Sequence, residues 1–87
     1  MGSYKVEIKR SALKDIKKLE KGSIPPIYRK IASLSDNPHP AQSQKLKGMD
    51  NSYRLRIGDY RIIYQIDHQN KAVMVFGIGH RKDIYRD

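Results

Sequence analysis

Three arginines lie close together in the segment YRLRIGDYRIIYQI, residues 53–66, where they could bind a phosphate group. The Gly-Asp dipeptide in its middle is a hairpin signal, and a two-residue turn there sets Arg56 opposite Arg61. Arg54, two residues back, shares their face. Like charges opposite each other destabilise a sheet, whereas guanidinium groups match phosphate oxygens. The segment therefore predicts an anion site; a solvated face with splayed side chains is the alternative.

The C-terminal segment GHRKDIYRD, residues 79–87, adds a second group of basic and aromatic side chains. RNA sites combine such residues, because cations bind phosphates and an aromatic ring stacks on an unpaired base. The side chains here that could move a proton are His80 and Tyr85, and tyrosine is a poor base near neutral pH. The sequence thus favours electrostatic stabilisation of a transition state over strong proton transfer. A frayed basic C-terminus is the alternative.

Basic residues dominate the charge of this 87-residue chain, which has 18 lysines and arginines, 9 aspartates and glutamates, and a net charge of +9. At 87 residues the chain is sized for one domain (1–87). In a domain this small, such a charge favours nucleic acid as partner, although a basic surface can also aid solubility or bind an acidic protein.

Cysteine is absent and the three histidines lack a zinc spacing, so we expect neither a metal nor a small-molecule cofactor. No apolar run approaches the ~20 residues of a membrane span, which predicts a cytoplasmic protein.

Hydrophobic patterns predict an α+β fold of order β-α-α-β-β-β. Two N-terminal helices should pack on one face of a twisted, mainly antiparallel, four-stranded sheet, and a short helical tail should end the chain. The expected strands are 4–9 and about 52–57, 60–66 and 72–78, the helices lie within 11–22 and 23–38, and the tail is 77–87.

Within these elements, Ser11 is the expected N-cap of the first helix and Gly22 its left-handed end. The expected apolar stripes are Leu13, Ile16 and Leu19 on the first helix and Ile27, Ile31 and Leu34 on the second. Alternation along the hairpin turns a further set towards the helices: Tyr53, Leu55, Ile57, Tyr60, Ile62 and Tyr64. The opposite face, which carries the arginines, is left open for function.

With this order of segments the chain resembles the RelE/ParE toxins of bacterial toxin–antitoxin pairs, specifically the RelE branch of messenger-RNA interferases. The resemblance rests on SALKDIKKL, QKLKGMDNSYRLRIGDYRIIYQID and IGHRKDIYR, and covers nearly the whole chain. It implies a compact α/β toxin that enters the ribosomal A site and cuts messenger RNA there. A ribose 2′-OH attacks the adjacent phosphate and leaves a 2′,3′-cyclic phosphate. It also implies a cognate antitoxin that wraps and blocks the toxin.

The resemblance assigns roles to individual residues. Arg54 and Arg56 fall where the family has basic residues that orient the attacking group and bind backbone. Arg61 matches the arginine that stabilises charge on the scissile phosphate. Arg81 matches the arginine associated with the leaving 5′-oxygen, and Tyr85 the tyrosine that stacks on the substrate base and has been proposed as an acid or base.

The chain departs from the family in two places. Arginines replace the lysines that some relatives carry on the first hairpin strand, and arginine is a poor base because it stays protonated. His80 is therefore a candidate base. The tail is also shorter between Arg81 and Tyr85 than in some relatives. Further cations are expected to contact RNA: Lys45, Lys47, Lys82 and Arg86.

Two other functions fit the sequence. The ParE branch has a similar fold but acts on DNA gyrase and performs no RNA chemistry. Its members generally lack the full set of basic residues and the tyrosine to which the resemblance assigns roles. A non-catalytic RNA-binding or ribosome-associated protein would need the same cations as a weak positional catalyst.

Overall fold

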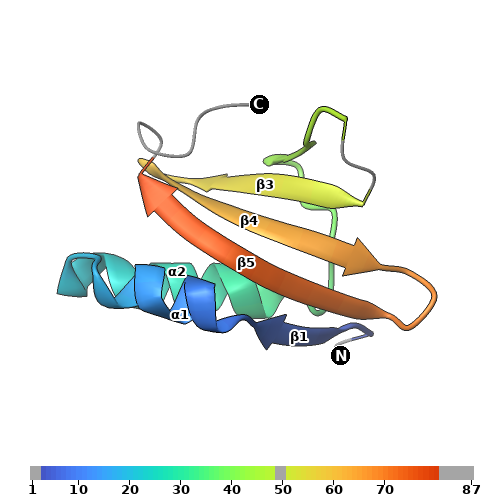
Figure 1. The fold of residues 1–87 in the computed structure, drawn as a ribbon, viewed down its shortest axis with the longest axis horizontal. Helices are drawn as coiled ribbons and strands as arrows, with labels where there is room; N and C mark the ends of the chain where they lie inside the picture. The colour runs from blue at the N-terminus through green and yellow to red at the C-terminus, as the bar shows by residue number, and fades with distance from the viewer. Residues whose placement is uncertain (1–2, 49–50, 81–87) are drawn as a thin grey trace.

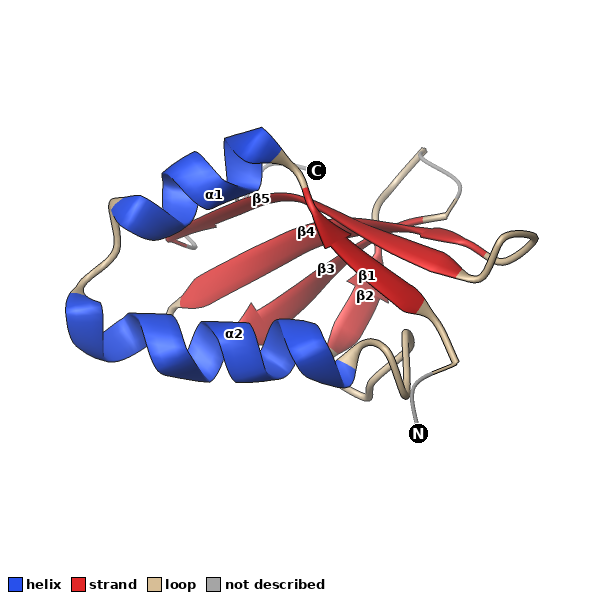
Figure 2. Ribbon diagram, turned by 90° about the horizontal axis from the view of Figure 1, so that it is seen from below, coloured by secondary structure: helices blue, strands red, loops and turns tan. Residues whose placement is uncertain are grey.

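The computed structural model describes residues 3–48 and 51–80, in which two α-helices cover one face of a sheet (Figures 1 and 2). Neither of these helices is long and apolar enough to cross a membrane. The elements run in the order β1 (Lys5–Ile8), α1 (Arg10–Lys17), the 3-10 helix η1 (Lys21–Ser23), α2 (Ile24–Ser33), β2 (Ser43–Lys45), β3 (Ser52–Ile57), β4 (Tyr60–Asp67) and β5 (Ala72–His80). The predicted α+β class and the helical layer are confirmed.

The sheet has five strands in the described residues, in the order β1-β5-β4-β3-β2, so the prediction of four strands was wrong. The added strand is β2, whose three polar residues pair antiparallel with β3. No strand was predicted there because a polar edge strand has no apolar alternation to reveal it. β1 pairs parallel with β5, and the other neighbouring strands pair antiparallel.

The predicted C-terminal tail began too early. Residues 77–80 belong to β5, since Gly77, Gly79 and His80 all pair with β4. The helical tail predicted beyond them lies outside the described residues.

Helix α1 begins at Arg10, with Lys9 in the cap position, so the prediction that Ser11 is the N-cap was wrong. The Ser11 hydroxyl instead donates to the carbonyl of Phe76 at 2.6 Å, and the Asp15 carboxylate accepts from the Ile78 amide at 3.0 Å. Both backbone groups lie just beyond Val75, the last residue of β5 that pairs with β1. Side chains of α1 therefore satisfy backbone groups where β1 ends.

These two anchors also fix which face of α1 is buried. Ala12 and Ile16 are buried, whereas Leu13, predicted to be in the core, is 40% exposed. The helix ends at Lys17 rather than at Gly22, which lies in η1. On α2 the predicted stripe is confirmed, because Ile27, Ile31 and Leu34 are all buried.

The hairpin of β3 and β4 supplies the centre of the core, as the alternation predicted. Leu55, Ile62 and Tyr64 are fully buried beneath the helices. Tyr53, Ile57 and Tyr60 are half-buried and pack against the same core.

Tyr64 combines burial with one specific polar contact: its hydroxyl donates to the carbonyl of Pro38 at 2.8 Å. Burial raises the pKa of this tyrosine above its ordinary value. Tyr64→Phe should lower the free energy of unfolding by about 1–3 kcal/mol, because it leaves a buried carbonyl without its donor. Urea denaturation measures this, with the 41%-exposed Tyr28 changed to phenylalanine as the control. Equal stability of the two variants would contradict the prediction.

Candidate nucleic-acid interface

The β3–β4 turn has the predicted register. Gly58 adopts φ 59°, a conformation that favours glycine, and Ile57 pairs with Tyr60. Arg56 therefore pairs directly with Arg61, and Arg54 pairs with Ile63 on the same face. That face is the one turned away from α1 and α2 (Figure 2). Two opposed arginines on the sheet face opposite the helices are the first element of the site.

The arginines border a hollow of about 210 Å³, which we call the arginine hollow. Its lining residues are Gln42, Gln44, Arg54, Arg56 and Arg61. Arg54 and Arg61 are half-buried, whereas Arg56 is exposed. Because Arg61 pairs with Gly79 on β5, the neighbouring strand places no side chain beside its guanidinium group.

Two hydrogen bonds orient the guanidinium groups. The Nη2 atom of Arg54 donates to Oε1 of Gln44 at 3.0 Å, across the pairing of β2 with β3. The Nε atom of Arg56 donates to the carbonyl of Gly58 at 3.4 Å, so the turn itself holds this side chain. Each contact uses one of the five N–H donors that a guanidinium group carries.

The chemistry available in the arginine hollow follows from its residue types. Its described lining holds three cations and two amides but no carboxylate. Guanidinium groups bind phosphate oxygens in charge-assisted pairs, and they can stabilise negative charge that develops during a reaction. They cannot serve as a general base, because they stay protonated. The geometry suits a phosphate clamp.

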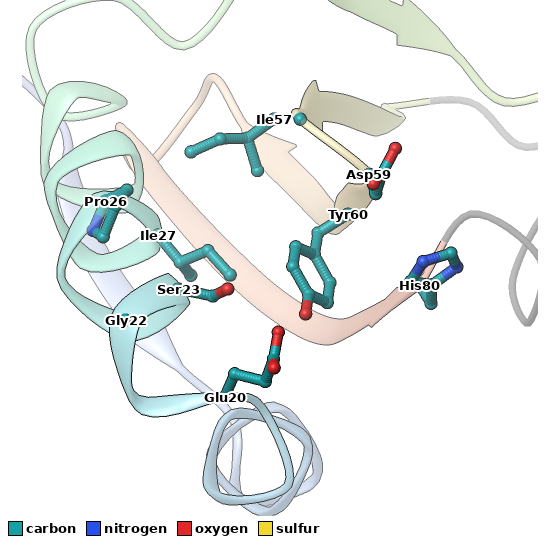
Figure 3. Close-up of a pocket in the computed structure, with 10 residues that line it drawn as sticks. Glu20, Gly22, Ser23, Pro26, Ile27, Ile57, Asp59, Tyr60 and His80 are labelled. Carbon is teal, nitrogen blue, oxygen red and sulfur yellow. The ribbon is translucent and has the colours of Figure 1, made fainter.

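His80 lies elsewhere, although the sequence grouped it with the arginines. It pairs with Tyr60, and the two rings meet edge to face with centroids 5.7 Å apart. Since Tyr60 packs against the core, His80 is on the helix side of the sheet, away from Arg61. It lines a hollow of about 460 Å³ with Glu20 and Asp59, where the Glu20 carboxylate points towards the Tyr60 hydroxyl (Figure 3). Two carboxylates make this second hollow unsuitable for an anion.

The other predicted RNA contacts are not gathered at the arginine hollow. Lys45 pairs with Tyr53, which places it on the helix side of the sheet by register, and Lys47 lies in the turn after β2. The remaining predicted residues follow β5 and lie outside the described residues: Arg81, Lys82, Tyr85 and Arg86. Among residues 3–48 and 51–80, no three His, Asp or Glu side chains form a cluster that could hold a metal.

Gln42 and Gln44 were not among the predicted site residues. Both precede β3 in the chain, in a segment for which no helix or strand was predicted, and Gln44 lies in β2. The spacing of two glutamines at i and i+2 was the available signal, since that spacing puts both side chains on one face of an extended chain.

Comparison with known proteins places this chain among the toxins of toxin–antitoxin pairs. A sequence model described as the ParE toxin of the type II toxin–antitoxin system parDE matches residues 6–85. The chain belongs to this family, the RelE/ParE toxins.

Relatives named RelE cover nearly the whole chain. A putative toxin RelE1 of Methanocaldococcus jannaschii is 31% identical over 97% of both chains. The mRNA interferase toxin RelE of Escherichia coli is 28% identical over 92% of this chain and 85% of its own. The archaeal RelE–RelB complex of Pyrococcus horikoshii contains a chain that is 27% identical, with a TM-score of 0.80 over 91% of this chain and 96% of that chain. A chain of the Mycobacterium tuberculosis RelBE2 complex is 25% identical, with a TM-score of 0.79 over 90% of this chain and 98% of that chain. The protein is thus a RelE-like toxin of a toxin–antitoxin system.

Proposed function

We propose that this toxin is a ribosome-dependent endoribonuclease that cuts messenger RNA in the ribosomal A site. The observation that carries the proposal is the arginine hollow, in which three guanidinium groups meet on the sheet face opposite the helices. The name of the E. coli relative, mRNA interferase, supports the same activity. Arrest of translation would follow from loss of the message.

In the proposed reaction the ribose 2′-oxygen attacks the adjacent phosphorus, and the bond from phosphorus to the 5′-oxygen breaks. The products are a 2′,3′-cyclic phosphate and a 5′-hydroxyl. Arg61 would stabilise the charge that grows on the phosphate oxygens, while Arg54 and Arg56 hold the backbone on either side. These roles need cations at fixed places, which the paired strands provide.

The proton transfers are assigned to other groups. Arg81 would stabilise the leaving 5′-oxygen, which takes up a proton from Tyr85 or from solvent water. Tyr85 would also stack on the substrate base. The 2′-OH proton would pass to solvent water, because His80, the base that the sequence suggested, lies beside Tyr60 on the far side of the sheet from Arg61. The contribution of His80 should therefore be the smallest of the set.

The proposed partners are the ribosome, the messenger and an antitoxin. Solved complexes of RelE relatives with RelB support a protein antitoxin for this chain as well. A net charge of +9 suits an acidic antitoxin segment, and also the RNA contacts proposed for Lys45, Lys47, Lys82 and Arg86. Because its proposed target is the translating ribosome, the toxin would act in the cytoplasm.

Gyrase inhibition is the second candidate, because the matching family carries the ParE name. ParE-like action would require none of the RNA chemistry above. A non-catalytic ribosome binder is the third candidate, and it would use the same cations without cutting.

Induction of the toxin in growing cells separates the three functions. We expect cleavage within the open reading frames of messages, seen as new primer-extension stops, with no activation of a DNA-damage reporter. Intact messages with a strong damage response would establish gyrase inhibition instead. Intact messages on stalled ribosomes would establish a passive binder.

A further inference from the structure

Gln44 lines the arginine hollow from a strand whose backbone is held by several hydrogen bonds. Its neighbours in β2 are fixed on both sides, since Ser43 pairs with Leu55 and Lys45 pairs with Tyr53 of β3. The amide and the hydroxyl of Ser43 also both donate to the Pro40 carbonyl, at 2.9 and 2.8 Å. The backbone under Gln44 is therefore anchored although β2 is an edge strand.

The orientation of the Gln44 amide follows from chemistry. Arginine has only donors, so Arg54 Nη2 at 3.0 Å must face the amide oxygen, and the two N–H donors of Gln44 point elsewhere. The Gln44 amide oxygen is therefore turned to Arg54, and the groups that these two side chains can offer to an anion are N–H donors. A phosphate, whose free oxygens are all acceptors, matches that arrangement.

A neutral acceptor has a specific advantage at this position. A carboxylate would hold the Arg54 guanidinium as well as an amide does, but it would neutralise the charge and compete with a phosphate. An amide fixes the geometry of the guanidinium and leaves its charge intact. Fixing a flexible side chain in advance also reduces the entropy lost when a ligand immobilises it.

We infer that Gln44 is a positioning residue, whose amide oxygen holds the Arg54 guanidinium in the orientation that binds an RNA phosphate in the arginine hollow. The inference rests on the proposed function and adds a residue to it. Gln44 acts through Arg54, so its effect must vanish when Arg54 is removed. That dependence distinguishes positioning from a general role in the stability of the sheet edge.

A double-mutant cycle on RNA binding tests the inference. Binding of a short fluorescent single-stranded RNA is measured by anisotropy at low salt for the full-length wild type, Gln44→Ala, Arg54→Ala and the double variant. Gln44→Ala should weaken binding roughly two- to twelve-fold in the wild type, the range expected from immobilising one long side chain, and should have no effect in the Arg54→Ala background. The matched control is Gln65→Ala, an exposed glutamine on the same sheet face outside the hollow, which should bind as the wild type does.

A charged variant adds a second readout. Gln44→Glu keeps an acceptor for Arg54 but introduces a negative charge, so it should bind RNA more weakly than Gln44→Ala. Thermal midpoints close to that of the wild type show that the variants are folded.

The outcomes separate this inference from the proposed function. Equal effects of Gln44→Ala in the two backgrounds, wild-type binding by Gln44→Glu, or no RNA binding by the wild type would each overturn the positioning role. RNA binding with the expected coupling, together with no cleavage on ribosomes, would leave Gln44 as a positioning residue and refute the endoribonuclease.

Discussion

Arg61→Ala should lower the single-turnover rate of messenger-RNA cleavage on ribosomes by about 10²–10³-fold, the loss typical of removing one donor that stabilises transition-state charge. Growth arrest on induction should disappear with it. The arginine is half-buried between Arg56 on β3 and Gly79 on β5, and at the paired position β5 has no side chain that could replace it. Thermal stability should not fall far, because the change also removes one of two opposed like charges.

Matched variants make this result specific. Arg10→Ala removes the same residue type from the exposed first turn of α1 and should leave cleavage unchanged. Arg61→Lys keeps the charge but loses the planar fork, so its rate should lie between those of the wild type and the alanine variant. His80→Ala should cost much less than Arg61→Ala, since His80 lies on the helix side of the sheet. An Arg61→Ala variant that remains fully toxic would exclude the phosphate clamp.

The hairpin shows what sequence can predict about this site. Strict alternation on both sides of a two-residue turn leaves one register that buries Leu55, Ile62 and Tyr64 together. Once the register is set, the opposition of Arg56 and Arg61 follows from geometry alone. The arginine face was therefore predictable without knowledge of the rest of the fold.

The position of His80 shows what sequence could not predict. A regular strand that buries Val73 and Val75 would place residue 80 on the arginine face. The β4–β5 ladder instead skips a residue, because Tyr64 pairs with Val75 while Ile63 pairs with Gly77. This bulge reverses the alternation, so Ile78 is buried and His80 lies beside Tyr60. Bulges depend on tertiary contacts, such as the hydrogen bond from the Ile78 amide to Asp15, which no local pattern records.

The ends of α1 and the identity of β2 were missed for a related reason. Serine is a common N-cap residue, but the Ser11 hydroxyl donates its hydrogen bond to the Phe76 carbonyl of β5 instead. Strand β2 forms because its backbone pairs with β3, and its own polar side chains show no strand pattern. Both features depend on contacts with residues distant in sequence. The pairing of β2 with β3 is the contact that brings Gln44 next to Arg54.

The ribosome should accelerate cleavage by at least a thousandfold over the rate on the same RNA free in solution. The described part of the chain gathers three cations around the arginine hollow but brings no base to it, since His80 is on the other face. Such a site can lower the barrier by stabilising charge, yet it cannot by itself bring the 2′-OH in line with its phosphate. Alignment of reacting groups can contribute roughly 7–11 kcal/mol, and a thousandfold acceleration needs only about 4 kcal/mol of that.

The measurement compares single-turnover rates, at saturating toxin, on one message either bound to ribosomes with an empty A site or free. Ribosomes whose A site is filled by tRNA are the control, and they should protect the message. Saturation removes differences in affinity, so the remaining rate ratio reports alignment. If free RNA were cut as fast as the ribosome-bound message, the toxin would have to align the 2′-OH itself. The arginine hollow would then be an incomplete description of its active site.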